Sequence, residues 1–526
     1  MATYSIWCGV GGTSVQAQTA VFGAATLVGA GGFKPVSLTG YSVSLASYNS
    51  LVSGSLGGYT PAISGGALVF SGAAGAPSGA VLRCGLSGGG TVDITISTQA
   101  NTYSVATVAE IQAALSAVGS AGGKTILVRR GEYSTAPVGT IEFGKNVSYV
   151  AEVNIVGEGT ADTGKGARFT PYISISSANK LRYTNVEVSS PTGWPAPFEV
   201  SGTSTDTIIE DCWIHGKYYN PMVASGVDYS NCNGITLEGA SVSGTIIRRN
   251  LITHVNNGIS VSVGASAFTI DLNEIKWHTA DAIQIGLGSP SSAVRQIHRN
   301  VIYAPLYTLA ETHSDAIQFT GIAADATQAN TNITIRQNVI FNCPAQSLGT
   351  FAAGPCAFVD TSSPAWGRQL TGMVFAGNVI AISNNNAAAF SNVSSGYFGY
   401  NTIVSSDTSG TNTPQLSLGS GQSAGTVVAK HNANDGQWLQ GAATYTTANN
   451  VTLGGRGTTI SYTTAFNWAN PAVAAANYNE LMANLTPKSG GPLLGATNAG
   501  AIGTGYCTFG QPRNATGWTY DAGLEV

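Results

Sequence analysis

The stretch Thr245-Ile-Ile-Arg-Arg-Asn-Leu-Ile decides the fold, because its pattern returns several times along the chain. Apolar residues stand on both sides of one polar position, and the other copies begin at Thr207, Phe268, Arg295, Ile333, Met373 and Gly396. The polar position holds Asn250, Asn273, Asn300, Asn338, Asn378 and Asn401, with Asp211 in an earlier copy and Asn185 and Asn432 as looser members. We predict two short strands joined by a bend at this position, because Asn tolerates left-handed backbone and its amide can bond to the neighbouring copy.

A second kind of strand recurs between the Asn positions. Its copies are Gly234-Ile-Thr-Leu, Gly258-Ile-Ser-Val, Ala282-Ile-Gln-Ile, Ala316-Ile-Gln-Phe and Ala357-Phe-Val-Asp. We expect the second and fourth residues to point inward and the third outward, with Asp360 off this outward column. From Asn250 onward the Asn positions are 23, 27, 38, 40 and 23 residues apart. A short repeat with insertions predicts a solenoid of stacked β-coils, from roughly Gly123 to Asn432.

Two apolar strands that flank an Asn bend, followed by a Gly-Ile-x-Val strand, resemble the repeat of right-handed parallel β-helices of the pectate-lyase-like superfamily. The resemblance implies an all-β fold for the repeating part of the chain. It implies no single reaction, because this fold hosts lyases, hydrolases, epimerases and proteins that only bind.

The segments outside the repeat have their own patterns. Residues 1–100 alternate short apolar runs with Gly/Ser/Ala turns, which predicts a separate small β domain. Thr107-Val-Ala-Glu110 is a capping-box pattern before apolar residues at helical spacing, so we expect a helix that covers the first coil. The predicted domains are therefore 1–100, a capping helix and β-helix over 101–435, and a β or irregular C-terminal region over 436–526 that resembles a wrap-back tail.

The composition argues against several classes of function. Charged residues make up only 9% of the chain and its formal net charge is -4. Nucleic-acid binding needs a clustered basic face, so Arg248-Arg249 is interpreted as a solvated pair. No stretch approaches the roughly 18 apolar residues of a membrane span, and neither a cofactor motif nor a metal cluster has convincing spacing. The N-terminus lacks the basic and apolar regions of a signal peptide.

The order of a β domain, a capping helix, a β-helix and a C-terminal tail resembles bacteriophage tailspike and tail-fibre proteins. That resemblance implies a protein of the virion tail, attached to the baseplate or tail through its N-terminal domain and acting at the host cell surface. It further implies a homotrimer that binds and depolymerises a host surface polysaccharide. Two alternatives stay open: a secreted bacterial polysaccharide lyase or glycoside hydrolase, and a glycan-binding adhesin or structural spike without catalysis.

Polar residues form two columns when the coils are aligned on the second strand. The outward position holds Thr236, Ser260, Gln284 and Gln318. The position before the strand holds Asn233, Asn257, Asp281 and Asp315. Just upstream are His254, His278 and His313, which we expect in equivalent loops, and Trp277 precedes His278.

These columns suggest two chemistries. Coils stack at about 4.8 Å, so Asp281 and Asp315 are candidate catalytic carboxylates near the separation of about 5 to 5.5 Å in retaining glycosidases. His278 or His313 is instead a candidate base for β-elimination, for which a cation must neutralise a uronate carboxylate. The candidate cations are Lys276, Arg295 and Lys217.

Candidate substrate-binding residues lie beside these groups. They are Gln284, Gln318, Trp277, Asn257 and Ser260. Each has a structural alternative, in which the Asp and Asn side chains cap turns, the glutamines stack on one another, and the Trp ring packs a loop onto the solenoid.

Overall fold

The computed structural model describes most of the repeating part of the chain and less of its two ends. The described residues are 18–22, 36–37, 45–71, 78–87, 91–98, 102–134, 141–158, 166–170, 172–190, 196–216, 232–239, 241–262, 264–287, 293–303, 315–321, 329–343, 359–360, 369–382, 386–390, 393–406, 413–420, 426–430, 432–441, 444–448, 450–453, 460–470, 475–489 and 493. The chain divides into two units, residues 1–189 with 207–213 and residues 190–206 with 214–526. The predicted domain boundaries at residues 100 and 435 stay predictions.

The first unit begins with a small β domain, as predicted. Four strands form a sheet in the order β1 (Gln18–Phe22), β7 (Thr91–Thr98), β6 (Ser78–Leu86) and β3 (Leu45–Ser55). Three more form a sheet in the order β2 (Val36–Ser37), β5 (Ala67–Ser71) and β4 (Thr60–Ser64). Its core is made by Leu45, Leu68, Ala80, Leu82, Cys84, Leu86 and Ile94.

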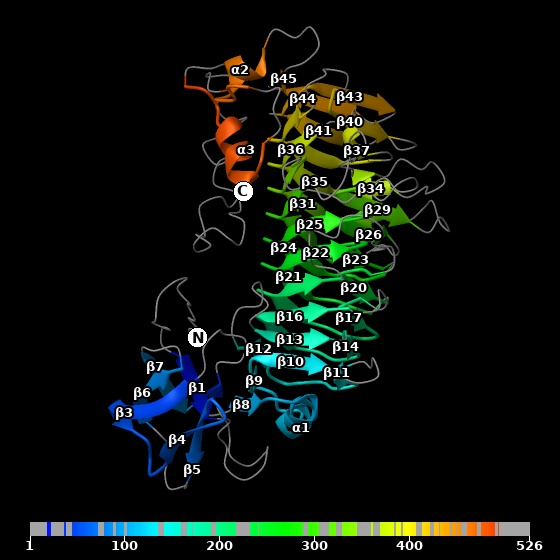
Figure 1. The fold of residues 1–526 in the computed structure, drawn as a ribbon. Coiled ribbons are helices and arrows are strands. Elements are labelled where there is room, and N and C mark those ends of the chain that lie inside the picture. Colours follow the sequence, from blue (N-terminus) through cyan, green and yellow to red (C-terminus); the bar gives the residue numbers. More distant parts are fainter. Residues whose placement is uncertain are drawn as a thin grey trace. The chain divides into compact units, whose positions relative to one another are not determined.

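The predicted capping helix is α1 (Val108–Val118). The Thr107 hydroxyl accepts the Glu110 N–H, and the Glu110 carboxylate accepts the Ala106 N–H, so both ends of the capping pattern are used. The four residues at helical spacing, Ile111 to Val118, are buried. The helix packs against the first strands of the solenoid, β8 (Thr102–Val105), β9 (Thr125–Val128) and β11 (Ile141–Lys145) (Figure 1).

In the rest of the first unit, successive parallel strands form three sheets. Their orders are β10-β13-β16, β11-β14 and β8-β9-β12-β15-β18. The remaining bounds are β10 (Gly131–Ser134), β12 (Val153–Gly157), β13 (Ala167–Thr170), β14 (Ile173–Ser176), β15 (Leu181–Thr184), β16 (Val186–Ser189) and β18 (Ile208–Glu210).

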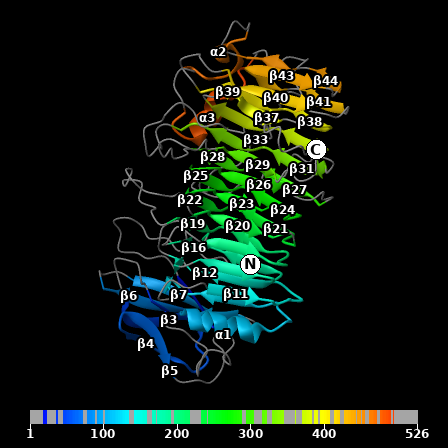
Figure 2. The same cartoon turned by 90° about the vertical axis from the view of Figure 1, so that its right-hand side faces the viewer.

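The second unit repeats this arrangement, with one strand from each of three parallel sheets in a coil (Figure 2). The first is the tail sheet: β19 (Trp213–His215), β22 (Leu251–Val255), β25 (Glu274–His278), β28 (Val301–Tyr303), β32 (Val339–Phe341), β36 (Val379–Ile382), β39 (Thr402–Ser405), β42 (Ala433–Asn434) and β45 (Val451–Thr452). The second is the glutamine sheet: β17 (Phe198–Ser201), β20 (Ile235–Glu238), β23 (Ile259–Val261), β26 (Ile283–Leu287), β29 (Ile317–Gly321) and β33 (Val359–Asp360).

The third sheet contains β21 (Thr245–Arg248), β24 (Phe268–Asp271), β27 (Arg295–His298), β31 (Ile333–Arg336), β35 (Met373–Ala376), β38 (Gly396–Gly399), β41 (Thr426–Lys430) and β44 (Thr444–Ala448). Short additional sheets pair β30 (Ala329–Thr331) with β34 (Gln369–Thr371), and β37 (Asn386–Phe390) with β40 (Gln415–Ser420) and β43 (Gly436–Gly441). The fold is thus the predicted all-β parallel β-helix solenoid. Within the described ranges, no helix is both long and apolar enough to cross a membrane.

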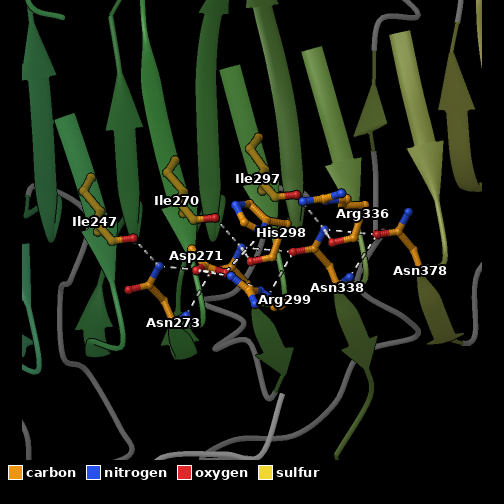
Figure 3. A network of polar contacts seen from close by, with 11 residues as sticks. Ile247, Ile270, Asp271, Asn273, Ile297, His298, Arg299, Arg336, Asn338 and Asn378 are labelled. Atoms are coloured by element: carbon orange, nitrogen blue, oxygen red, sulfur yellow. Dashed lines mark hydrogen bonds and ion pairs between the residues drawn. The ribbon is translucent and has the colours of Figure 1, made fainter. Parts of the chain in front are cut away.

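The Asn residues of the repeat form a continuous hydrogen-bonded ladder between the third sheet and the tail sheet (Figure 3). Each side-chain oxygen accepts two bonds from the Asn of the preceding coil, as when Asn338 Oδ1 accepts the Asn300 N–H at 3.1 Å and Asn300 Nδ2 at 3.0 Å. Each amide nitrogen also reaches back to a backbone carbonyl, as Asn300 Nδ2 does to Ile270 at 3.0 Å. The ladder runs from Asn250 through Asn432 to Asn450, so Asn432 is a full member.

The left-handed backbone of the bend lies one residue earlier than predicted. Positive φ values occur at Arg249, Leu272, Arg299, Gln337, Gly377 and Tyr400, each immediately before a ladder Asn. Asn185 and Asp211 have φ of 57° and 54°, so they occupy the bend and not the ladder position. Cys212 follows Asp211 and donates its thiol to the Tyr183 carbonyl at 3.9 Å, which is the contact that an Asn amide makes in later coils. The amide is therefore selected for bonding between coils and not for the bend itself.

Residues 460–470 and 475–489 lie back along the tail sheet. They include α2 (Tyr462–Ala465) and α3 (Tyr478–Asn484), whose apolar side chains share a core with Val301, Tyr303, Val339 and Phe341 of the sheet (Figure 1). One buried polar contact fixes the segment, since the Asp435 carboxylate accepts both the Tyr462 hydroxyl and the Ser405 N–H. This face of the tail sheet is accordingly covered by the protein itself.

Candidate functional site

The outer column of the glutamine sheet is present as predicted. Strand register places Thr236, Ser260, Gln284 and Gln318 beside one another on successive strands. The residues on either side of each are buried, for example Ile283 and Ile285 around Gln284, so the column faces outward. Glu199 extends the column at one end, because it is in register with Thr236.

Asp360 belongs to the same column, which corrects the expectation that it lies apart from it. β33 is shifted by one residue from the predicted alignment, so Val359 pairs with Ile317 and Asp360 with Gln318. The alignment of Ala357 with Ala316 that the sequence suggests is therefore one residue out of register.

The Asn and Asp residues before these strands form a second ladder. Asn233 Oδ1 accepts the Asn257 N–H, Asn257 Oδ1 accepts the Asp281 N–H at 2.9 Å, and Asp281 Oδ1 accepts the Asp315 N–H at 3.2 Å. Asp281 and Asp315 are 3% and 0% exposed. These are the contacts of the turn-capping alternative, and Asn257 is a cap of the same kind.

The carboxylates also hold the two glutamines. Gln284 Nε2 donates to Asp281 Oδ2 at 2.9 Å and to Gln318 Oε1 at 3.3 Å, while Gln318 Nε2 donates to Asp315 Oδ2 at 2.9 Å. Both glutamine side chains are half-buried. Asp281 and Asp315 therefore orient the glutamines, and Gln284 Oε1 keeps acceptor capacity toward the outside.

The histidines lie in strands of the tail sheet and not in loops at its surface. His215, His254 and His278 belong to β19, β22 and β25 and are 0%, 0% and 2% exposed. Burial lowers the pKa of His278 to about 3, which keeps its imidazole neutral and inside the protein. Burial, followed by His215 and Lys276, lowers the pKa of His254 to about 3. His313 lies outside the described residues.

Trp277 is not brought together with the glutamine column. It is in β25 of the tail sheet, where its ring stands 4.7 Å from the Lys276 ammonium and 4.7 Å from the His254 ring. The ring also packs against the apolar cluster that α2 and α3 form with the tail sheet. Its contacts are those of the packing alternative.

A pair of glutamates on the glutamine sheet was missed from the sequence. Glu199 in β17 faces Thr236, and Glu238 lies two residues farther along β20, so both are on the outer side. Strands about 4.8 Å apart with a rise of about 3.3 Å per residue place their Cα atoms about 8 Å apart. The segment Phe198-Glu-Val-Ser could have revealed this pair, because its alternating pattern aligns with Ile235-Thr-Leu-Glu.

The environment distinguishes the two glutamates. Burial first, and then the negative Glu238, raise the pKa of Glu199 above its usual value, while Glu238 is exposed. Between them lies Thr236, which is 7% exposed and whose hydroxyl has no hydrogen-bond partner among the described residues. A half-buried and an exposed glutamate thus share one outer surface, and the pKa of the half-buried one is raised. In the described part of the chain, no three His, Cys, Asp or Glu residues are arranged to hold a metal ion.

Comparison with known proteins adds a fold likeness only. No protein-family model matches the chain, and no curated protein matches it. Similar solved structures include an alginate lyase from Paenibacillus sp. (13% identity, 67% of this chain and 99% of that chain, TM-score 0.37). Others are PfbA, a surface adhesin of Streptococcus pneumoniae (10%, 66% and 86%, 0.38), and a pectate lyase from Bacillus sp. (14%, 67% and 81%, 0.26). These TM-scores carry no argument, so the parallel β-helix is established by the strand pairing itself.

Proposed function

We propose that the outer face of the glutamine sheet binds a carbohydrate polymer and that Glu199 and Glu238 hydrolyse it. The observation that supports this proposal is the position of the glutamate pair, which flanks Thr236 at one end of a polar column. Neighbouring strands are about 4.8 Å apart. The step from one strand to the next is therefore close to the length of one sugar residue in a polymer. A regular row of hydroxyl, amide and carboxyl groups suits the repeated hydroxyls of such a chain.

The proposed roles follow from the different surroundings of the two glutamates. Glu199, whose pKa is raised by burial and by Glu238, donates its proton to the glycosidic oxygen as the bond from that oxygen to the anomeric carbon breaks. Glu238, which is exposed, accepts a proton from a water molecule whose oxygen bonds to the anomeric carbon. One water molecule is consumed, and each new chain end carries a hydroxyl group. Gln284, Gln318 and Ser260 bind the sugars on the neighbouring coils.

The test is cleavage by matched single-site variants. Glu199→Gln and Glu238→Gln should each lower the rate of reducing-end formation by about 10²- to 10⁴-fold, the usual size of general acid–base catalysis. Glu142→Gln is the control, because Glu142 is an exposed glutamate on β11 that pairs only with Lys145 among the described residues. Unchanged cleavage by both active-face variants would reject the glutamate pair. Binding without cleavage by the unmodified chain would instead support an adhesin.

We further infer that the chain works as a bacteriophage tailspike or tail fibre on a host surface polysaccharide. The layout supports this setting, with a small N-terminal β domain, a helix that covers the first coils, and α2 and α3 packed on the tail sheet. In this setting the N-terminal domain binds the virion tail and the chain forms a homotrimer. Light scattering that gives the mass of a trimer would support it, whereas a monomer would favour a secreted enzyme.

A further inference from the structure

We infer that the glycan bound by the glutamine sheet is neutral, and that the reaction is hydrolysis and not β-elimination. The inference rests on the proposed function and adds the class of substrate. It comes from the charges that strand register places on the outer face. These are the charges that a bound polymer would meet first.

From β17 to β29, the described outer positions of the glutamine sheet carry acids and neutral groups only. Two of them, Glu199 and Glu238, are carboxylic acids, and none from β17 to β29 is Lys, Arg or His. The positions are Glu199, Ser201, Thr236, Glu238, Ser260, Gln284, Gly286, Gln318 and Thr320. The sheet does carry an exposed lysine on β11, Lys145, whose ammonium pairs with the Glu142 carboxylate. An acidic polysaccharide would bring one negative charge per uronate against this surface. At about 5 Å in water-like surroundings, each such pair weakens binding several-fold, and more where water is excluded.

Two of the candidate cations that could neutralise a uronate carboxylate bind other groups of the chain, away from the glutamine sheet. Lys276 is in the tail sheet, where its ammonium contacts Glu274 Oε1 at 3.0 Å and the Tyr303 hydroxyl at 3.1 Å. Arg295 is in the third sheet, 2% exposed, and donates to the Ser266 carbonyl. Lys217 lies outside the described residues. A β-elimination needs a cation to stabilise the carbanion next to the carboxylate, and the outer positions of β17 to β29 supply none.

The groups that are present match uncharged sugar hydroxyls. The neutral Ser260, Gln284 and Gln318 side chains are partly exposed on the outer side, where they can bond to sugar hydroxyls. The glutamine amides offer a donor and an acceptor at fixed positions, since Asp281 and Asp315 hold them. The exposed Glu238 accepts from hydroxyl donors. A neutral glycan therefore meets complementary groups along the whole column.

The experiment compares glycans that differ only in charge. Polygalacturonate, alginate and hyaluronate are each paired with a carboxyl-reduced form, in which every uronate carboxylate has become a primary alcohol. Binding by the full chain is measured by affinity electrophoresis, and cleavage by reducing ends and by the ultraviolet absorbance of unsaturated products. We expect at least one pair in which the reduced form binds about tenfold or more tightly, with no unsaturated product.

The outcomes separate the two proposals. Tighter binding of the acidic forms, or an unsaturated product, would overturn the neutral-glycan inference and leave carbohydrate binding intact. No binding to either member of all pairs would reject the proposed function, and the substrate class with it. Gln284→Lys sharpens the comparison, because a cation on the column should raise binding of the acidic forms at low salt, and added salt should remove that gain. No gain from this substitution would show that the polymer does not contact the column.

Discussion

Two corners of the same solenoid use amide side chains in opposite ways. At the Asn ladder every coil has the same residue, each 0% or 1% exposed from Asn250 to Asn432, and its hydrogen-bonding groups are used within the chain. On the glutamine sheet the column changes from Glu to Thr, Ser, Gln and Gln, and Gln284 Oε1 keeps acceptor capacity toward the outside. A uniform, fully bonded column indicates structural support. A varied column with unused polar atoms indicates a surface that binds something else.

The largest expected effect on the chemistry comes from the varied column, in Glu199→Gln and Glu238→Gln. Their loss of about 10²- to 10⁴-fold in cleavage rate should come with less than about 0.5 kcal/mol change in the free energy of unfolding, because both residues are at least partly exposed. Urea unfolding of the same variants checks this separation. A large loss of stability would mean that the glutamates support the fold.

The largest expected effect on stability comes from Asn300→Ala. This substitution removes amide bonds to the Ile270 and His298 carbonyls and to Asn338, and it leaves the Asn273 donors without their acceptor. The free energy of unfolding should fall by about 3 to 5 kcal/mol, since several buried polar groups lose partners together. Asn467→Ala, at an exposed position, is the control and should stay within about 0.5 kcal/mol. If the two variants were equally stable, the ladder would not stabilise the fold.

A smaller effect on binding is expected from Asp281→Asn. The new amide nitrogen would face Gln284 Nε2, so two donors would oppose each other where one bond now fixes the glutamine. Glycan affinity should fall by about tenfold, the value of one well-placed hydrogen bond of about 1.5 kcal/mol. Asp281→Asn in a Gln284→Ala background should have little further effect on affinity. An equal loss in that background would show that Asp281 contacts the glycan directly or takes part in the chemistry.

The smallest effect is a shift in titration. Glu238→Gln removes the negative neighbour that helps to raise the pKa of Glu199, so that pKa should fall toward its usual value and Glu199 should lose its proton at lower pH. Carbon-13 NMR of glutamate-labelled protein, with Glu199→Gln to assign the signal, measures this shift. An unchanged titration would place the two carboxylates too far apart to act as a pair.

The sequence predicted the regular parts of the molecule well, because regular contacts leave regular patterns. The capping helix, the buried Ile residues and the outer column all follow from spacing alone. The sequence misplaced the bend, because Arg, Leu, Gln and Tyr adopt left-handed backbone there and no residue type marks the position. It missed Glu199 for a similar reason, since Phe198 replaces the usual Ile and hides one more copy of the strand. The burial of His278 could not be predicted, because it results from packing between strands that the neighbouring residues in the sequence do not indicate.

The most direct test is a crystal structure of the Glu238→Gln chain with a bound oligosaccharide from a glycan that the unmodified chain cleaves. We predict sugar rings along the glutamine sheet, with a glycosidic oxygen within hydrogen-bonding distance of Glu199 and a sugar hydroxyl on Gln284. An oligosaccharide bound elsewhere, with the outer face of the glutamine sheet empty, would contradict it.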